Sequence, residues 1–212
     1  GLDVMTTCAT SHAIMCNTAL DMQRDPVYAS TVNNLVARTS KVEYGGESQS
    51  WHLVHYLVEE IGLDKVRDAV KNPLKMNIAA YYGPDMQREG ACAGDDPFMP
   101  TYMEQLIEAL GGTPIDYESK CNSVGSTSML TLEDSSLAMT AAVLSDAIQS
   151  GADLIVSACT ISHINLDSYQ SKAGRVAGKN TIVPVCHLSE LVAFALGSVS
   201  YTHLTLPTTT PV

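Results

Sequence analysis

Residues 151–170 of this 212-residue chain read GADLIVSACTISHINLDSYQ. The apolar run DLIVSA (153–158) predicts a buried strand, and the polar residues after it predict a helix from about Ile161. Cys159 stands where the strand gives way to the helix, and Ser162 follows it three positions later. A strand, a polar loop and a helix in this order are typical of α/β proteins, in which ligands bind at the carboxyl ends of the strands.

The rest of the C-terminal half continues this alternation. Expected strands are KMNIAAYYG (75–83), TPIDY (113–117) and NTIVPV (180–185), and expected helices are MPTYMEQLIEALGG (99–112), TLEDSSLAMTAAVLSDAIQSG (131–151) and a segment from His187. Thr131 and Asp134 resemble a capping box, and Gly151 supplies a C-terminal stop. The pattern predicts the α/β class, with a parallel sheet flanked by helices.

The chain also resembles itself. An apolar run, then C-x-x-S-H, then a helical stretch appears at residues 2–20 and again at 153–170. Later in each half, His-Leu opens an apolar helix, HLVHYLVEEIG from His52 and HLSELVAFALG from His187. Two such echoes in the same order predict two pseudo-repeated domains. We expect the C-terminal part of a truncated first domain at 1–72, a second domain at 73–198, and a non-native or disordered tail at 199–212.

The composition argues against two classes of partner. Twelve Lys and Arg stand against 23 Asp and Glu, and the net charge of −11 opposes binding to nucleic acid or to an anionic membrane surface. The chain lacks an unbroken apolar run of roughly 18 residues, so no direct membrane insertion is expected. The six cysteines are scattered singly, which favours a reducing compartment, and we expect a cytoplasmic protein.

Three motifs are spaced regularly along the second half. YYGP ends at Pro84, KCNS places Cys121 after 36 intervening residues, and CTIS starts at Cys159 after 36 more beyond Asn122. This spacing resembles the cysteine-rich CCG domain, which occurs twice in the B subunit of heterodisulfide reductase and in related subunits of succinate, lactate and glycerol-phosphate oxidoreductases. The resemblance extends over residues 1–198.

The cysteines themselves depart from the family pattern. In the second half, Pro84, Asn122 and Ser162 stand where the family has cysteine, and Ser123 replaces its glycine. In the first half, a cysteine of the C-x-x-C pair is kept and its partner is a serine. The resemblance therefore implies cofactor-binding positions at Cys8, Ser11, Cys121, Cys159 and Ser162. It implies metal ligation by the thiols Cys8, Cys121 and Cys159.

Iron–sulfur clusters are held by thiolates, and a serine hydroxyl is a harder donor that is more difficult to deprotonate. We therefore expect either an iron–sulfur cluster at a degenerate site or no cofactor. The resemblance implies a subunit of a heterodisulfide-reductase-like cytoplasmic redox complex, with iron–sulfur or thiol-based electron transfer. Its partners would be other redox subunits, such as a ferredoxin-like iron–sulfur subunit. The alternative is a cluster-free scaffold that keeps the fold and the subunit interface.

Other interpretations of the same residues remain open. Cys8, His12 and Cys16 recur every four residues and would share a helix face, which suits zinc, although no fourth ligand is evident. Cys159 near a helix N-terminus, with His163 as base, could act as a nucleophile. The structural alternatives are a buried cysteine and a helix histidine bonded to a nearby carbonyl.

Two loops complete the predictions. SVGSTS (123–128) is interpreted as a solvated loop with a helix cap, since it lacks the lysine of a phosphate-binding loop. REGACAGDDP (88–97) is interpreted as a mobile insertion, in which Cys92 could substitute for the cysteine absent at Pro84.

Overall fold

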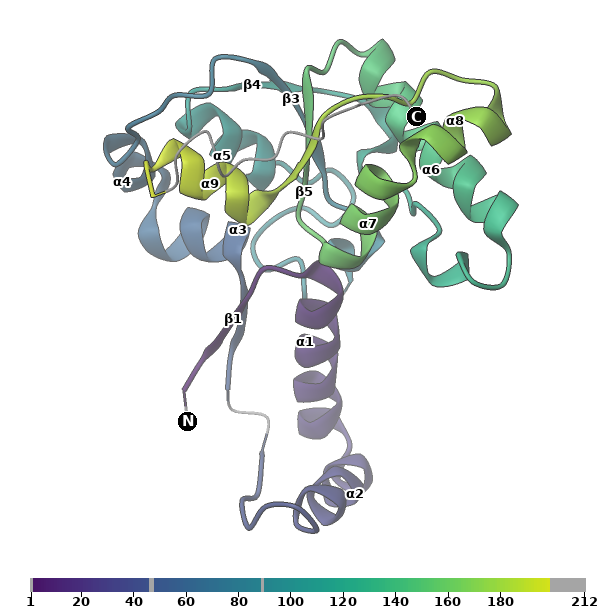
Figure 1. The fold of residues 1–212 in the computed structure, drawn as a ribbon. Coiled ribbons are helices and arrows are strands. Elements are labelled where there is room, and N and C mark those ends of the chain that lie inside the picture. Colours follow the sequence, from purple (N-terminus) through teal and green to yellow (C-terminus); the bar gives the residue numbers. More distant parts are fainter. Residues whose placement is uncertain (1, 46–47, 89, 199–212) are drawn as a thin grey trace.

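The computed structural model describes residues 2–45, 48–88 and 90–198. Its centre is a four-stranded sheet in the order β4-β3-β5-β6, with every neighbouring pair parallel (Figure 1). Its strands are β3 (Asn77–Tyr81), β4 (Thr113–Ile115), β5 (Leu154–Ser157) and β6 (Val185–His187). A second, two-stranded parallel sheet joins β1 (Val4–Thr6) to β2 (Ser50–His52). The predicted α/β class with parallel sheets flanked by helices is confirmed, and the predicted tail at 199–212 lies outside the described residues.

Helices cover both faces of the larger sheet because successive strand side chains point to opposite sides. Ile78 and Ala80 of β3 belong to one buried cluster, and Ala79 and Tyr81 belong to another. The first cluster packs against α3 (Leu53–His55), α4 (Leu63–Asp68), α5 (Tyr102–Ala109) and α9 (Leu188–Ala195). The second packs against α6 (Glu133–Gln149) and α7 (Thr160–Ser168), and α8 (Gln170–Ala177) packs on α6.

The helices α1 (Ala9–Arg24) and α2 (Pro26–Val36) project from this body together with β1 and β2 (Figure 1). Asp25 begins α2 by accepting hydrogen bonds from the backbone N–H groups of Val27 and Tyr28. None of the residues of α2 is buried. The remaining turns are the π-helix η1 (Tyr56–Ile61) and the 3₁₀-helices η2 (Pro84–Gln87), η3 (Glu118–Cys121) and η4 (Ser126–Ser128). Within the described ranges, no helix combines the length and apolar character that a membrane crossing needs.

Two local predictions are wrong. α6 begins at Glu133 with Leu132 as its N-cap and no side-chain cap, and the hydroxyl of Thr131 donates to the Ser128 carbonyl instead of forming a capping box with Asp134. The strand predicted at 180–185 begins at Val185. Val183, two residues before it, bonds to a side chain instead of a strand: Gln170 donates to the carbonyl of Val183 at 2.7 Å and accepts from its N–H at 3.0 Å. The predicted stop at Gly151 is confirmed, since Gly151 has φ +91° just beyond α6.

The two strand–cysteine–helix units have matching local geometry. Cys8 (φ −118°, ψ 117°) and Cys159 (φ −128°, ψ 118°) are the N-cap residues of α1 and α7. Each N–H donates to the hydroxyl two residues earlier, Thr6 at 3.1 Å and Ser157 at 3.3 Å.

The second elements of the two units match as well. His52 (φ −81°, ψ 144°) and His187 (φ −82°, ψ 146°) are the N-cap residues of α3 and α9. In the strand registers Thr6 pairs with His52 and Ser157 pairs with His187. The division into a first domain at 1–72 and a second at 73–198 stays a prediction, which these correspondences support.

The side chain of Gln170 supplies the bonds that a neighbouring strand would supply, so its loss leaves a buried backbone N–H and C=O unpaired. We predict that Gln170→Met lowers the free energy of unfolding by about 2–4 kcal/mol. Chemical denaturation followed by circular dichroism measures this change. Gln149→Met, at the exposed end of α6, is the matched control and stays within about 0.5 kcal/mol of wild type. Equal stability of the two variants would contradict this account of Gln170.

Candidate functional site at the carboxyl edge of the sheets

The strand ends bring several of the predicted site residues to one region. Cys8 follows β1, Cys159 follows β5, and Cys121 ends the turn η3 after β4. Cys159 belongs to the first buried apolar cluster, and Cys8 and Cys121 pack against that same cluster. These three cysteines therefore contact the same apolar cluster, and their assembly into one binding site stays a prediction.

The two cysteine-capped helices meet directly. The N–H of Ala9 donates to the Ala158 carbonyl at 3.1 Å, and Nε2 of His52 lies 2.9 Å from the same oxygen. The hydroxyl of Thr10 lies 3.4 Å from Sγ of Cys159 and donates to the carboxylate of Asp85 at 2.6 Å. Asp85 directly follows Pro84, so the segment after β3 also reaches the point where α1 and α7 meet.

The thiol of Cys8 has a lowered pKa. Partial burial raises its pKa, but hydrogen bonds from the backbone and side chain of Ser11, and from the backbone and side chain of Thr160, outweigh burial and bring the pKa to about 7. Ser11 stands where the resemblance expects the second cysteine of a pair. In the structure it interacts with the sulfur of Cys8, and at neutral pH a large fraction of Cys8 is thiolate.

Ser162 and Cys121 have other neighbours. Ser162 is buried and hydrogen-bonds the Tyr81 hydroxyl, which itself donates to the Asn122 carbonyl at 2.9 Å. Burial raises the pKa of Cys121, an effect that Lys120 and a hydrogen bond from Gln87 oppose.

The turn that carries Cys121 is fixed on both sides. The Lys120 carbonyl accepts from the N–H groups of Tyr82 and Gly83. The carboxylate of Asp146 accepts from both the N–H and the hydroxyl of Ser119, at 2.8 and 2.6 Å. The position of Cys121 is therefore determined by β3 and by α6.

These donors do not fit an iron–sulfur cluster held by about four thiolates. Pro84 has no side-chain ligand atom, the side chain of Asn122 is an amide and not a thiolate, and Ser162 is hydrogen-bonded to Tyr81. Over residues 2–45, 48–88 and 90–198, no three His, Cys, Asp or Glu side chains are arranged to hold a metal ion. The ligand roles of Cys8, Cys121 and Cys159 stay predictions.

The zinc interpretation of α1 receives no support from the geometry. Sγ of Cys16 lies 3.7 Å from the ring nitrogens of His12, but Cys8 faces Ser11 and Thr160. His12 instead lies 3.1 Å from the Ser50 hydroxyl and 3.2 Å from the Ala91 carbonyl, which confirms the carbonyl-bonded alternative for this residue.

A cluster of three histidines was not predicted from the sequence. The rings of His12, His52 and His55 lie 5.6 to 5.9 Å apart and are almost fully buried. Burial lowers the pKa of all three, to about 4 for His52 and about 3 for His55, and the neighbouring imidazoles lower the latter two further. The only local signal was the spacing of His52 and His55 in HLVH, because His12 joins them through the tertiary fold.

The two loops are packed more closely than predicted. Val124 in SVGSTS is buried, and its carbonyl accepts from Thr140 and Asn165, so this loop is not simply solvated. In the described part of the 88–97 segment, Ala91 is buried and the backbone of Gly94 donates to Glu59 at 2.8 Å. The segment thus contacts the residues that follow β2, and Arg88 forms an ion pair with Asp85 at 2.9 Å. A ligand role for Cys92 stays a prediction.

No family model matches the chain. The B subunit of the ferredoxin:CoB-CoM heterodisulfide reductase of Methanosarcina mazei is 27% identical over 198 residues, which are 92% of this chain and 66% of that protein. The chain resembles heterodisulfide reductase B subunits. The B subunit of the ferredoxin/F(420)H(2)-dependent CoB-CoM heterodisulfide reductase of Methanosarcina acetivorans is 27% identical over 93% of this chain and 66% of its own length. The chain thus spans slightly under two thirds of these two proteins.

A relative with a different name aligns over the same share of the chain. The 8-methylmenaquinol:fumarate reductase membrane anchor subunit of Wolinella succinogenes is 29% identical over 92% of this chain and 68% of its own length. Among solved structures, a hypothetical protein from Helicobacter pylori superimposes with a TM-score of 0.64 at 12% identity, over 87% of this chain and 33% of that protein. This likeness concerns the fold alone.

The buried neutral histidines predict an acid-sensitive fold. Unfolded histidines bind protons below about pH 6.5, whereas folded His52 and His55 do so only near pH 4 and 3, so stability falls as the pH drops from 6.5 toward those values. We predict that His52→Gln reduces the slope of unfolding free energy against pH, between pH 6 and 5, by roughly 1.4 kcal/mol per pH unit. Urea denaturation at a series of pH values measures the slope.

Val66→Ala is the control for this measurement, because it removes buried methyl groups and no titrating group. It lowers stability equally at every pH and leaves the slope unchanged. If His52→Gln also left the slope at its wild-type value, His52 would not be neutral in the folded protein.

Proposed function

We propose that this chain is a subunit of a cytoplasmic redox complex of the heterodisulfide reductase B kind, and that it acts through thiols. The observation that carries the proposal is the thiol of Cys8, whose pKa is about 7 because Ser11 and Thr160 hydrogen-bond its sulfur. The relatives named as heterodisulfide reductase B subunits support membership of a redox complex. The sequence analysis expected a ferredoxin-like iron–sulfur subunit as a partner, and we propose that such a subunit is also the electron donor.

Thiol–disulfide exchange suits the surroundings of Cys8. A thiolate is the attacking species in such exchange, and attack is most efficient for a thiol whose pKa is near the ambient pH. The Cys8 thiolate attacks one sulfur of a bound disulfide, the S–S bond breaks, and the other sulfur leaves as a thiolate. The product is a mixed disulfide between Cys8 and the substrate.

Cys159 is the proposed second thiol. It caps the helix that meets α1, and Thr10 and Thr160 link the surroundings of the two cysteines. Attack by Cys159 on Cys8 releases the second substrate thiol and leaves a Cys8–Cys159 disulfide. Two electrons and two protons from the complex then restore both thiols. Overall one disulfide is reduced to two thiols.

An iron–sulfur cluster at the degenerate site is the alternative to this thiol mechanism. A cluster in the second half would have to use Cys121 and Cys159 with Ser162, and one in the first half Cys8 with Ser11. The contacts of both serines argue against either cluster. A cluster-free scaffold remains the second candidate, and it is favoured by the loss of a donor at Pro84. The three possibilities differ in thiol reactivity and in metal content.

We predict that one thiol reacts rapidly with the aromatic disulfide 5,5′-dithiobis(2-nitrobenzoate), with a rate that rises through a midpoint near pH 7. Cys8→Ala removes this fast phase, and Ser11→Ala moves its midpoint to higher pH because the sulfur loses a hydrogen-bond donor. Cys121→Ala is the matched control and retains the fast phase, since burial raises the pKa of that thiol. A fast phase that survives Cys8→Ala, or the absence of one in wild type, would favour the scaffold.

Metal content separates the thiol mechanism from the cluster. After anaerobic purification of the full chain, the thiol mechanism predicts substoichiometric iron, no acid-labile sulfide and no visible absorption band. About four irons and four sulfides per chain, lost together in Cys159→Ala, would replace the thiol mechanism by an iron–sulfur one.

A further inference from the structure

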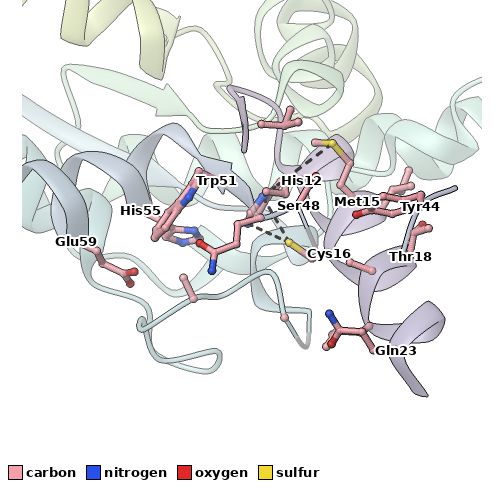
Figure 2. A pocket seen from close by; sticks show the side chains of 18 residues that line it. His12, Met15, Cys16, Thr18, Gln23, Tyr44, Ser48, Trp51, His55 and Glu59 are labelled. Atoms are coloured by element: carbon pink, nitrogen blue, oxygen red, sulfur yellow. Dashed lines mark hydrogen bonds between the residues drawn. The ribbon is translucent and has the colours of Figure 1, made fainter. Parts of the chain in front are cut away.

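A cavity of about 580 Å³ lies between α1, the strands β1 and β2, and the turn around Gly90 and Ala93. Its lining does not include Cys8, Cys121 or Cys159. Figure 2 shows His12, Met15 and Cys16 on α1 together with Trp51, His55 and Glu59 from β2 and the segment that follows it. The volume is in the range of cavities that hold small organic molecules. The proposed redox role does not involve it.

His55 carries an unpaired polar atom at this cavity. Its side chain lines the cavity and is 1% exposed, and its Nδ1 is buried without a hydrogen-bond partner. A buried imidazole nitrogen without a partner is costly, so such atoms are commonly completed by a ligand or a water molecule. His12, which also lines the cavity, already has a contact at each of its ring nitrogens.

The equivalent helix in the second half, α9, starts with a glutamate at the position of His55. Counted from the capping histidines His52 and His187, His55 occupies the position of Glu190. Glu190 closes a capping box by accepting from the N–H of His187 at 2.9 Å. In the first unit that carboxylate is replaced by an imidazole, which turns toward the other histidines, and the chain continues as a π-helix through Glu59. π-helical turns are frequent at functional sites.

The charges around the cavity disfavour an anionic ligand. Of the residues that the structure describes, 18 line the cavity, and they include Glu59 and no Lys or Arg. Burial lowers the pKa of His12 and His55, so both imidazoles are uncharged at neutral pH. A phosphate or carboxylate would find no cation here and would face the carboxylate of Glu59.

The apolar part of the lining favours a flat ring. Trp51 and Tyr44 contribute aromatic surfaces, and Ile14, Met15 and Leu20 contribute aliphatic ones. Aromatic rings bury a large area against such surfaces in offset or edge-to-face contacts. Because Nδ1 of His55 is buried, the imidazole has to turn about its Cβ–Cγ bond to present this nitrogen to a ligand. A hydroxyl group can donate or accept, so it then completes Nδ1 in either tautomer.

We propose that this cavity binds an uncharged, planar aromatic molecule whose hydroxyl group pairs with His55. The proposal is independent of the thiol chemistry at Cys8. Trp51, the single tryptophan of the chain, gives one indole N–H signal in a ¹⁵N-correlated NMR spectrum and reports directly on occupancy.

Three naphthalene probes test the proposal on the full chain at pH 7. 2-Naphthol, which is neutral at this pH, shifts the indole signal saturably. Naphthalene lacks the hydroxyl and 2-naphthoate carries a negative charge, and each binds about ten-fold more weakly than 2-naphthol. No saturable shift with 2-naphthol up to its solubility limit, or equal affinities for all three probes, would overturn the proposal.

Variants assign the selectivity to particular side chains. His55→Phe equalises the affinities for 2-naphthol and naphthalene, whereas His163→Phe, a histidine outside the cavity, retains the preference for 2-naphthol. Glu59→Gln, a change at an exposed side chain, strengthens binding of 2-naphthoate and provides a second readout if His55→Phe fails to fold. Unchanged preference in both His55→Phe and Glu59→Gln would overturn the assignment to this cavity.

Discussion

The carbonyl of Ala158 joins the two halves of the molecule. It accepts from the backbone of Ala9 and from Nε2 of His52, and His52 in turn accepts at Nδ1 from the N–H of Val54. This pair of bonds requires the neutral imidazole with its proton on Nε2, because a protonated ring has no acceptor. Burial lowers the pKa of His52, and the bond to the Ala158 carbonyl, which raises it, only partly offsets that effect, so the ring stays neutral at the point where α1 meets α7.

The contact between α1 and α7 brings together a cysteine from each half of the molecule. Cys8 and Cys159 cap the two helices that meet there, and the hydrogen bonds that lower the pKa of Cys8 come partly from Thr160 on the opposite helix. From the same point, the rings of His52 and His55 extend toward the cavity. The site around Cys8 and Cys159 and the cavity are therefore separate sites, and the buried cluster of His12, His52 and His55 lies between them.

The sequence was informative where a feature depends on neighbouring residues. The runs around β3 and β5 are buried on both faces, so their apolar composition predicted strands, and Gly151 predicted the end of α6. The strand expected at 180–185 began later because Gln170, distant in sequence, bonds the backbone of Val183. The sequence placed Cys8 and Ser11 together, but it could not predict the thiol pKa, which also needs Thr160. The histidine cluster and the cavity were not predicted because residues 12–23, 44–45, 48–59 and 90–93 come together only in the fold.

The central claim is that a neutral His52, protonated at Nε2, joins the two halves. Long-range ¹H–¹⁵N correlation spectra of the histidine side chains, recorded from pH 8 to pH 5 and assigned with His52→Gln, test it most directly. The account predicts that the His52 signals keep the pattern of the Nε2–H tautomer throughout this range. A His52 that titrates near pH 6.5, or that carries its proton on Nδ1, would contradict it.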